Sequence, residues 1–200
     1  MDFFAPASPG TEHPLRDELC ELDFCGVRLN RGGIPFQGDW SEGYRACLQS
    51  RIAQRIQALL GTFEAGTPEA LYAGIQAIDW SLYLSPAHTL AIGAFCRSPI
   101  FSHSGFVVLK TKDAIVDQIR DSLGERPSIC KEDPDVRLFV YINDRRVKVY
   151  LDLAGEPLHK RGYRLGAGEA PLRETLAAAL LRFSGWDRQS VLADPMCGSG

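Results

Sequence analysis

Segments with the period of a strand and segments with the period of a helix alternate along most of the chain. In residues 1–64 we expect helices at 11–23 and 39–50, because apolar side chains recur there every three or four positions. Strands are expected at four short apolar runs, 3–8, 27–29, 34–36 and 55–63. The last run also fits a helical period, and we interpret it as a strand. The order β-α-β-β-α-β predicts a small ferredoxin-like subdomain.

Turn and capping residues place the ends of these elements. Thr11 and Ser41 are of the residue types that cap helix N-termini, and the glycines of residues 30–33 favour a hairpin between strands 27–29 and 34–36. In the helix over 39–50, the periodicity predicts that three side chains point inward: Tyr44, Cys47 and Leu48.

A second α/β unit is predicted over residues 65–155. Thr67 should cap a helix that ends near Trp80, and residues 88–96 form a strand-like apolar run. A long helix is expected over 103–123 and should end at Gly124. Its predicted apolar face consists of Phe106, Leu109, Val116, Ile119 and Leu123. Two β-branched runs, 136–142 and 147–153, flank the polar residues 143–146 and predict a hairpin.

Residues 156–170 are rich in glycine and basic side chains and are expected to form a linker. Pro171 then opens an amphipathic helix that Gly185 should end. The apolar residues 191–193 follow and predict one more strand, so residues 171–200 resemble the first helix and strand of a further α/β domain.

Composition narrows the class of protein. The 200 residues are 45% apolar and 24% charged, as in an ordinary globular protein, and no run approaches the ~18 apolar residues of a membrane span. The N-terminus lacks the basic segment of a signal peptide. None of the six cysteines forms a Cys-x-x-Cys pair, so we expect no metal site and reduced thiols in a cytoplasmic protein without membrane contact.

Positive charge gathers in the middle of the chain. Formal charge is −4 over residues 1–100, +2 over 101–165 and −1 over 166–200, so a nucleic-acid partner should meet the middle segment. Its candidate contacts lie on the long helix, at the hairpin and in the linker: Lys110, Lys112, Arg145, Arg146, Lys148, Lys160, Arg161, Tyr163 and Arg164. For Arg145 and Arg146, a solvated hairpin tip is an equal alternative. Arg161 could instead bind the protein's own backbone.

The last seven residues, Asp194-Pro195-Met196-Cys197-Gly198-Ser199-Gly200, follow an apolar run. Glycines after a strand let the backbone approach a ligand closely. The sequence has the form of the first S-adenosyl-L-methionine motif of amino-methyltransferases, DPxCGSG. We expect Asp194, Pro195, Cys197, Gly198 and Gly200 to contact this cofactor, with Thr175 on the preceding helix as a second contact. No His/Asp partner supports Cys197 as a nucleophile.

The resemblance extends to most of the chain. Residues 158–164, 170–180 and 184–186 resemble the joining segment of bacterial large-subunit (23S) rRNA guanine-N2-methyltransferases that carry a THUMP domain. Residues 110–117 and 133–137 resemble the THUMP helix and hairpin of that family, and residues 32–39 resemble its preceding ferredoxin-like piece.

The resemblance implies an α/β (α+β) chain of four parts: a ferredoxin-like subdomain (1–64), a THUMP RNA-binding domain (65–155), a basic linker (156–170) and the start of a Rossmann-like methyltransferase domain (171–200). It implies S-adenosyl-L-methionine as cofactor, large-subunit rRNA as partner and a C-terminal methyltransferase domain in cis. The family's Asn/Asp-Pro-Pro-Tyr catalytic loop does not occur in these residues. This part alone is expected to bind RNA without catalysing and to hold the cofactor weakly.

Three other functions are compatible with parts of the sequence. The first is a non-catalytic THUMP adaptor that binds RNA. The second is an RNA thiolation enzyme, which also carries a THUMP domain, but its SGGxDS-type loop does not occur here. The third is a DNA amino-methyltransferase, which shares DPxCGSG but not the THUMP-like region.

Overall fold

The computed structural model describes residues 1–163 and 171–197, and its elements form two compact units. Unit 1 combines Met1–Gln57 with Glu156–Gly200, and unit 2 is Ala58–Gly155. Unit 2 is therefore inserted between the two segments of unit 1. The chain closes this insertion as it returns, because the amide of Leu158 donates to the carbonyl of Gln54 at 2.9 Å.

Unit 1 is built on an antiparallel strand pair with helices. Its elements are β1 (Asp2–Pro6), α1 (Glu12–Glu21), β2 (Gly33–Gln37), α2 (Trp40–Gln49) and α5 (Glu174–Phe183). β1 pairs with β2 from Asp2 opposite Gln37 to Pro6 opposite Gly33. Phe3 and Phe36, which lie opposite each other on these paired strands, stack in the core with ring centroids 5.1 Å apart and so support the register.

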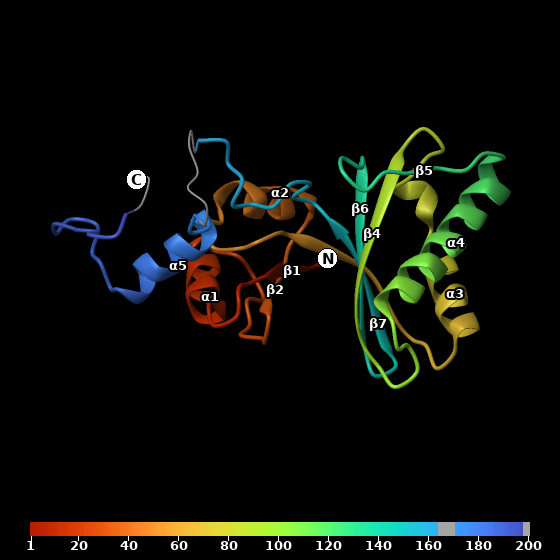
Figure 1. Ribbon diagram of the computed structural model, residues 1–200, viewed down its shortest axis with the longest axis horizontal. Helices are drawn as coiled ribbons and strands as arrows, with labels where there is room; N and C mark the ends of the chain where they lie inside the picture. The colour runs from red at the N-terminus through yellow and green to blue at the C-terminus, as the bar shows by residue number, and fades with distance from the viewer. Residues whose placement is uncertain (164–170, 198–200) are drawn as a thin grey trace. The chain divides into compact units, whose positions relative to one another are not determined.

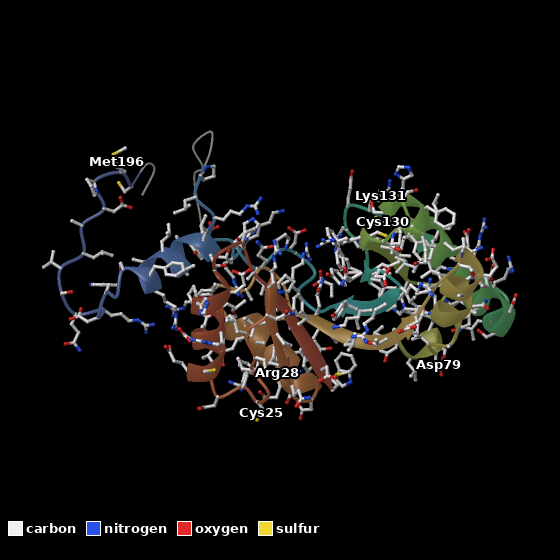
Figure 2. The ribbon with its side chains drawn as sticks, turned by 90° about the horizontal axis from the view of Figure 1, so that it is seen from below. Cys25, Arg28, Asp79, Cys130, Lys131 and Met196 are labelled. Atoms are coloured by element: carbon white, nitrogen blue, oxygen red, sulfur yellow. The ribbon has the colours of Figure 1, made fainter. Side chains whose placement is uncertain are left out.

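The predicted strand at 27–29 and its hairpin are wrong. Residues 27–29 form no strand: an isolated bridge joins Cys25 to Gln37, the Arg28 amide donates to the Pro35 carbonyl at 3.3 Å, and Cys25 and Arg28 lie on the loop that leads into β2 (Figure 2). β2 pairs with β1 instead. Leu29 is 46% exposed, so a strand here would bury little apolar surface, and the left-handed Gly26 (φ 66°) interrupts the extended backbone. The described order over residues 1–64 is therefore β-α-β-α-β.

Two predictions about α2 are also wrong. Its N-cap is Asp39, whose carboxylate accepts the Glu42 amide at 3.0 Å, and the Ser41 hydroxyl donates to that same carboxylate. Tyr44 and Leu48 point outward, since they are 54% and 79% exposed. The fully covered positions are the small Gly43 and Ala46. Small residues let the helix backbone pack closely against the neighbouring elements. A search for large apolar side chains at helical spacing does not detect such a packing face.

Unit 2 is a mixed sheet with two helices on one side, α3 (Pro68–Gln76) and α4 (Ser104–Leu123) (Figure 1). The strands are β3 (Gln57–Glu64), β4 (Thr89–Arg97), β5 (Ser128–Ile129), β6 (Val136–Asn143) and β7 (Arg146–Asp152). Their order is β3-β7-β6-β4-β5, with β4 parallel to β5 and β6, and β6 antiparallel to β7. A 3-10 turn, η1 (Trp80–Leu82), precedes β4.

The core of unit 2 lies between the helices and one face of the sheet. Trp80 is fully buried there, and its indole N–H donates to the Ile75 carbonyl at 2.9 Å. The predicted apolar face of α4 is largely wrong, because Phe106, Leu109 and Leu123 are 44–58% exposed. The buried side chains of α4 are Val107, Thr111, Ala114, Ile115 and Ile119. The true face includes Thr111 and Ala114, which the sequence pattern did not mark as apolar.

Several local signals are confirmed. The Thr67 hydroxyl accepts the Ala70 amide at 3.2 Å as the N-cap of α3, and Gly124 ends α4 in the left-handed conformation at φ 79°. The hairpin of β6 and β7 forms as predicted. The strand expected at 191–193 is absent from the described residues, and Val191 is 97% exposed. A strand needs a neighbour to bond to, and the described residues place none beside this segment.

No helix in the described residues has the length and apolarity that a membrane crossing requires. No group of three His, Cys, Asp or Glu side chains in residues 1–163 and 171–197 is arranged to hold a metal ion.

Candidate nucleic-acid interface and cofactor loop

The turn between β6 and β7 presents three of the predicted RNA-binding cations together. Asp144 adopts a left-handed conformation (φ 57°), and its amide donates to the Arg97 carbonyl at 2.7 Å. The Arg145 carbonyl accepts the Ala65 amide at 2.8 Å. The turn is thus held between the ends of β4 and β3. Arg145 and Arg146 are exposed and Lys148 is half-buried, so three cations project from a fixed backbone.

The other two predicted cations of unit 2, Lys110 and Lys112, lie on α4, in the helical layer. The Lys112 ammonium pairs with Asp113 at 2.9 Å, and that of Lys110 lies 5.0 Å from the Tyr72 ring centroid. The structure therefore does not unite these lysines with the hairpin cations.

Another basic side chain of α4, Arg120, is also paired with an acidic side chain of the same helix. Arg120 pairs with Asp117 at 2.9 Å, and the Tyr72 hydroxyl donates to the same carboxylate at 2.7 Å. This hydrogen bond to Asp117 raises the pKa of Tyr72 to about 12. A layer whose cations already have partners offers less to a phosphate than the unpaired cations at the hairpin.

In the linker, Arg161 has a structural contact. Its guanidinium donates to the carbonyls of Cys47 at 2.9 Å and Ser50 at 2.8 Å, at the C-terminal end of α2. A cation there satisfies free helix carbonyls and opposes the negative end of the helix dipole. Lys160 pairs with Glu156 at 2.6 Å, whereas the Tyr163 side chain is 66% exposed. Arg164 lies outside the described residues.

The start of the DPxCGSG motif forms a small exposed turn. The Asp194 carboxylate accepts the Met196 amide at 2.9 Å, and Met196 projects from the exposed C-terminal segment (Figure 2). Pro195 and Cys197 are exposed as well, while Gly198 and Gly200 lie outside the described residues. An exposed turn after an apolar run fits one side of an S-adenosyl-L-methionine site, but the described residues do not enclose the ligand.

Thr175 is not part of that turn. It is buried on α5, at 4% exposure, and does not line the open groove of unit 1 to which Asp194, Met196 and Cys197 contribute. α5 is instead joined to α1, because Arg182 donates two hydrogen bonds to the Glu21 carboxylate at 2.6 and 2.8 Å. The cofactor role of Thr175 stays a prediction.

Sequence reasoning did not identify the aromatic residues next to the hairpin cations. Phe95 on β4 and Tyr141 on β6 stack with ring centroids 5.5 Å apart and an interplanar angle of 10°. They are 49% and 36% exposed. The sequence does show that polar and aromatic side chains occupy the odd-numbered positions of β6, which indicates that they share one face of the strand. It does not show which strand lies beside β6, so the pairing of Tyr141 with Phe95 could not be predicted.

Three family models match consecutive parts of the chain. They are the RlmL ferredoxin-like domain over residues 2–57, the THUMP domain over 65–152 and the RMKL-like methyltransferase domain over 161–200. These matches agree with the predicted order of domain types, whereas the exact boundaries stay a prediction.

Curated relatives carry one function in their names. The chain is 45% identical over 202 residues to a ribosomal RNA large subunit methyltransferase K/L of Magnetococcus marinus, and 44% identical over 204 residues to one of Syntrophotalea carbinolica. These alignments cover 99% and 100% of the chain but only 28% and 29% of the relatives. The chain thus spans less than a third of the length of the curated relatives it matches.

Solved structures share the arrangement of elements. A predicted N6-adenine-specific DNA methylase of Listeria monocytogenes aligns with a TM-score of 0.87 at 30% identity, over 100% of this chain and 52% of that one. A protein assigned as a methyltransferase and complexed with SAH aligns with a TM-score of 0.85 at 29% identity, with the same coverage. TrmN from Thermus thermophilus shares the fold, with a TM-score of 0.71 at 21% identity over 92% of this chain and 54% of that one.

Fold, motif and relatives agree. The chain matches, in order, the RlmL ferredoxin-like domain, the THUMP domain and the RMKL-like methyltransferase domain, and it is similar to a part of the ribosomal RNA large subunit methyltransferases K/L.

Proposed function

We propose that the chain is the RNA-recognition part of an S-adenosyl-L-methionine-dependent enzyme that methylates the N2 atom of a guanine in large-subunit (23S) rRNA. One observation carries this proposal: a THUMP match over residues 65–152 stands in the same chain as a methyltransferase match over 161–200, which ends in the DPxCGSG motif. The named relatives act on large-subunit rRNA, and an aligned structure holds SAH, the product that S-adenosyl-L-methionine leaves after methyl transfer.

Within this function, unit 2 contacts rRNA and the turn at Asp194 contacts the cofactor. S-adenosyl-L-methionine supplies the methyl group when it is bound. Asp194 shapes the turn through its bond to the Met196 amide, and the exposed Pro195 and Cys197 would contact the ligand. The catalytic loop and the second wall of the cofactor site belong to a methyltransferase domain in cis. Residues 1–200 alone should therefore transfer no methyl group.

RNA binding and cofactor binding are measured separately on this chain. Fluorescence anisotropy with a labelled large-subunit rRNA hairpin, at several salt concentrations, should give an affinity that falls as salt rises, because phosphate contacts release counterions. Binding that is absent at low salt, or that does not depend on salt, would exclude the RNA role. Calorimetry with S-adenosyl-L-methionine should give a Kd weaker than micromolar, the level that corresponds to about −8 kcal/mol. Micromolar binding would contradict the half-site assignment.

Methyl transfer tests the enzyme. The protein with its cis methyltransferase domain should move tritium from labelled S-adenosyl-L-methionine to rRNA, and digestion should yield N2-methylguanosine. Methylation of another base position would refute the guanine-N2 assignment. RNA binding without any methyl transfer by that longer protein would favour the adaptor function instead.

A further inference from the structure

The sheet of unit 2 has two faces of different chemistry. Side chains alternate between the faces along each strand. The helix-covered face carries the core residues Leu138, Val140 and Ile142 of β6 together with Val147 and Val149 of β7. α3 and α4 both lie on that side (Figure 1). The opposite face therefore carries the intervening residues of the same strands.

The register brings these intervening residues into rows across three strands. Phe95, Tyr141 and Lys148 form one row, and Arg97, Asn143 and Arg146 form the next, toward the 143–146 turn. Gly93, Phe139 and Tyr150 form the row on the other side. We call the part of this face that consists of Phe95, Arg97, Phe139, Tyr141, Arg146 and Lys148 the aromatic face.

Three aromatic rings lie on this face, and two of them, Phe95 and Tyr141, are exposed. Phe95 and Tyr141 are nearly parallel, and both retain more than a third of their exposure. The Phe139 ring lies over Gly93, where a Cβ would come within 3.1 Å of it. A cross-strand aromatic pair stabilises a sheet. Aromatic side chains that remain exposed beside each other form an apolar surface patch, which is typical of a binding site.

Cations border these rings on one side. Arg97, Arg146 and Lys148 take part in no ion pair among the described residues. Further along β6 on the same face, the buried Nε–H of Arg137 also lacks a described acceptor. Tyr150 and Asp152 of β7 are buried, so the open surface is confined to the end of the sheet near the 143–146 turn. Two acidic side chains lie near that end, Asp144 in the turn and Glu64 at the end of β3.

Flat exposed rings bordered by unpaired cations match the chemistry of single-stranded RNA. Unstacked bases bind to aromatic faces, and the adjoining phosphates bind to arginine and lysine. A duplex would present its phosphates but not its base faces. An acidic peptide would use the cations but would leave the stacked rings without a partner.

We propose that the aromatic face is a binding platform for single-stranded RNA, on which unpaired bases stack against Phe95, Tyr141 and Phe139 while Arg97, Arg146 and Lys148 hold the phosphates. This inference rests on the proposed RNA-recognition function and adds to it the RNA structure recognised: an unpaired loop or bulge rather than a helix. The paired lysines of α4 lie outside the platform.

The test measures binding of the 200-residue chain to a fluorescein-labelled single-stranded RNA and to a duplex of the same sequence. The variant F95L/Y141L keeps apolar side chains at both positions and removes the rings. It should lose at least about ten-fold in affinity for the single strand, since each base stacked on an aromatic ring contributes about 1–3 kcal/mol. Its affinity for the duplex should not change. The control L109A alters an exposed apolar residue of α4 and should bind like wild type.

The cations have a different signature. R97Q/R146Q should lower the slope of log K against log salt by about 1.4, because each phosphate contact to a single strand contributes about 0.7. F95L/Y141L should leave that slope unchanged. K131Q replaces an exposed lysine in the loop before β6, marked in Figure 2, and should retain the wild-type slope.

Failure of this proposal differs from failure of the RNA role. If wild type binds the single strand and F95L/Y141L, shown folded by circular dichroism, binds it equally well, the platform is refuted and the RNA role stands. If wild type binds neither RNA, both are refuted. Ultraviolet crosslinking gives a check that needs no variant: the crosslinked peptide should contain Tyr141 or Phe95, and a crosslink confined to α4 would overturn the platform.

Discussion

The hydroxyl of Ser50 donates a hydrogen bond to the Glu18 carboxylate at 2.7 Å, and both side chains are buried in unit 1. Glu18 also accepts the amides of Arg51 at 3.1 Å and Ile52 at 3.2 Å. One carboxylate of α1 thus satisfies three donors in the segment between α2 and β3. The Ser50 carbonyl in turn accepts from Arg161, so the same segment is held from both sides.

Replacing Glu18 by alanine should destabilise unit 1 by about 2–4 kcal/mol, since it leaves buried donors without an acceptor. The measurement is hydrogen exchange of the Arg51 and Ile52 amides together with urea unfolding. E21Q is the matched control on the same helix. It alters the pair with Arg182, in which the Glu21 side chain is 60% exposed, and about 0–1 kcal/mol is expected. Equal effects of the two variants would contradict the bracing role of Glu18.

Arg161 should stabilise the C-terminal end of α2. A lysine cannot reproduce two parallel hydrogen bonds to separate carbonyls, so R161K should cost about 1–2 kcal/mol and speed hydrogen exchange near Ser50. The neighbouring K160Q affects only an exposed pair with Glu156 and should leave stability unchanged. If R161K weakens RNA binding without affecting exchange, Arg161 is an RNA contact rather than a helix cap.

Tyr72 should titrate late and make unit 2 sensitive to alkali. Its pKa is raised from 10.0 to about 12 by the hydrogen bond to Asp117, so the folded state keeps a proton that the unfolded state releases. The resulting stability is present below pH 10 and is lost as the pH rises from 10 to 12. Absorbance at 295 nm should show one late tyrosine that Y72F removes and that D117N shifts back toward 10. A wild-type titration without any late tyrosine would refute the bond.

Gly74 should be required in α3 for reasons of space. A Cβ there would lie 2.3 Å from the Phe63 ring, so G74A should destabilise unit 2 by about 1–3 kcal/mol although alanine favours helices. G105A is the control, because a Cβ at Gly105 in the first turn of α4 meets nothing within 4 Å. It should be neutral or slightly stabilising. F63L should rescue G74A, and a stabilising G74A would refute the clash.

Local signals in the sequence predicted the elements well where one or two residues decide the outcome. Thr67 and Gly124 set helix ends by their own conformations, and the two β-branched runs around residues 143–146 are joined by a turn so short that they pair with each other. The short run at 27–29 failed as a strand because only an isolated bridge forms beside β2 there, and the exposed Leu29 buries little apolar surface. The inward faces of α2 and α4 failed because small or polar residues, such as Ala46 and Thr111, cover part of the packing surface.

The candidate interface depended on a register that no local pattern encodes. Phe95 and Tyr141 are 46 positions apart and meet only because β4 and β6 run parallel in one specific alignment. The hairpin cations could be predicted because they neighbour each other in sequence. Arg161, in contrast, looked like part of a basic cluster, and its bonds to carbonyls more than a hundred residues earlier are a product of the fold.

The insertion of unit 2 into unit 1 has a kinetic consequence. Glu156 and the residues after it can meet α1 and α2 only after the intervening chain has been brought back on itself, and an unfolded loop of that length carries a large closure entropy. If unit 2 folds first, much of this entropy cost has already been met. β3 and β7 are neighbours in its sheet, so the two points at which the chain enters and leaves unit 2 lie close together. Completion of unit 1, including the bonds of Leu158 and Arg161, should therefore follow the folding of unit 2.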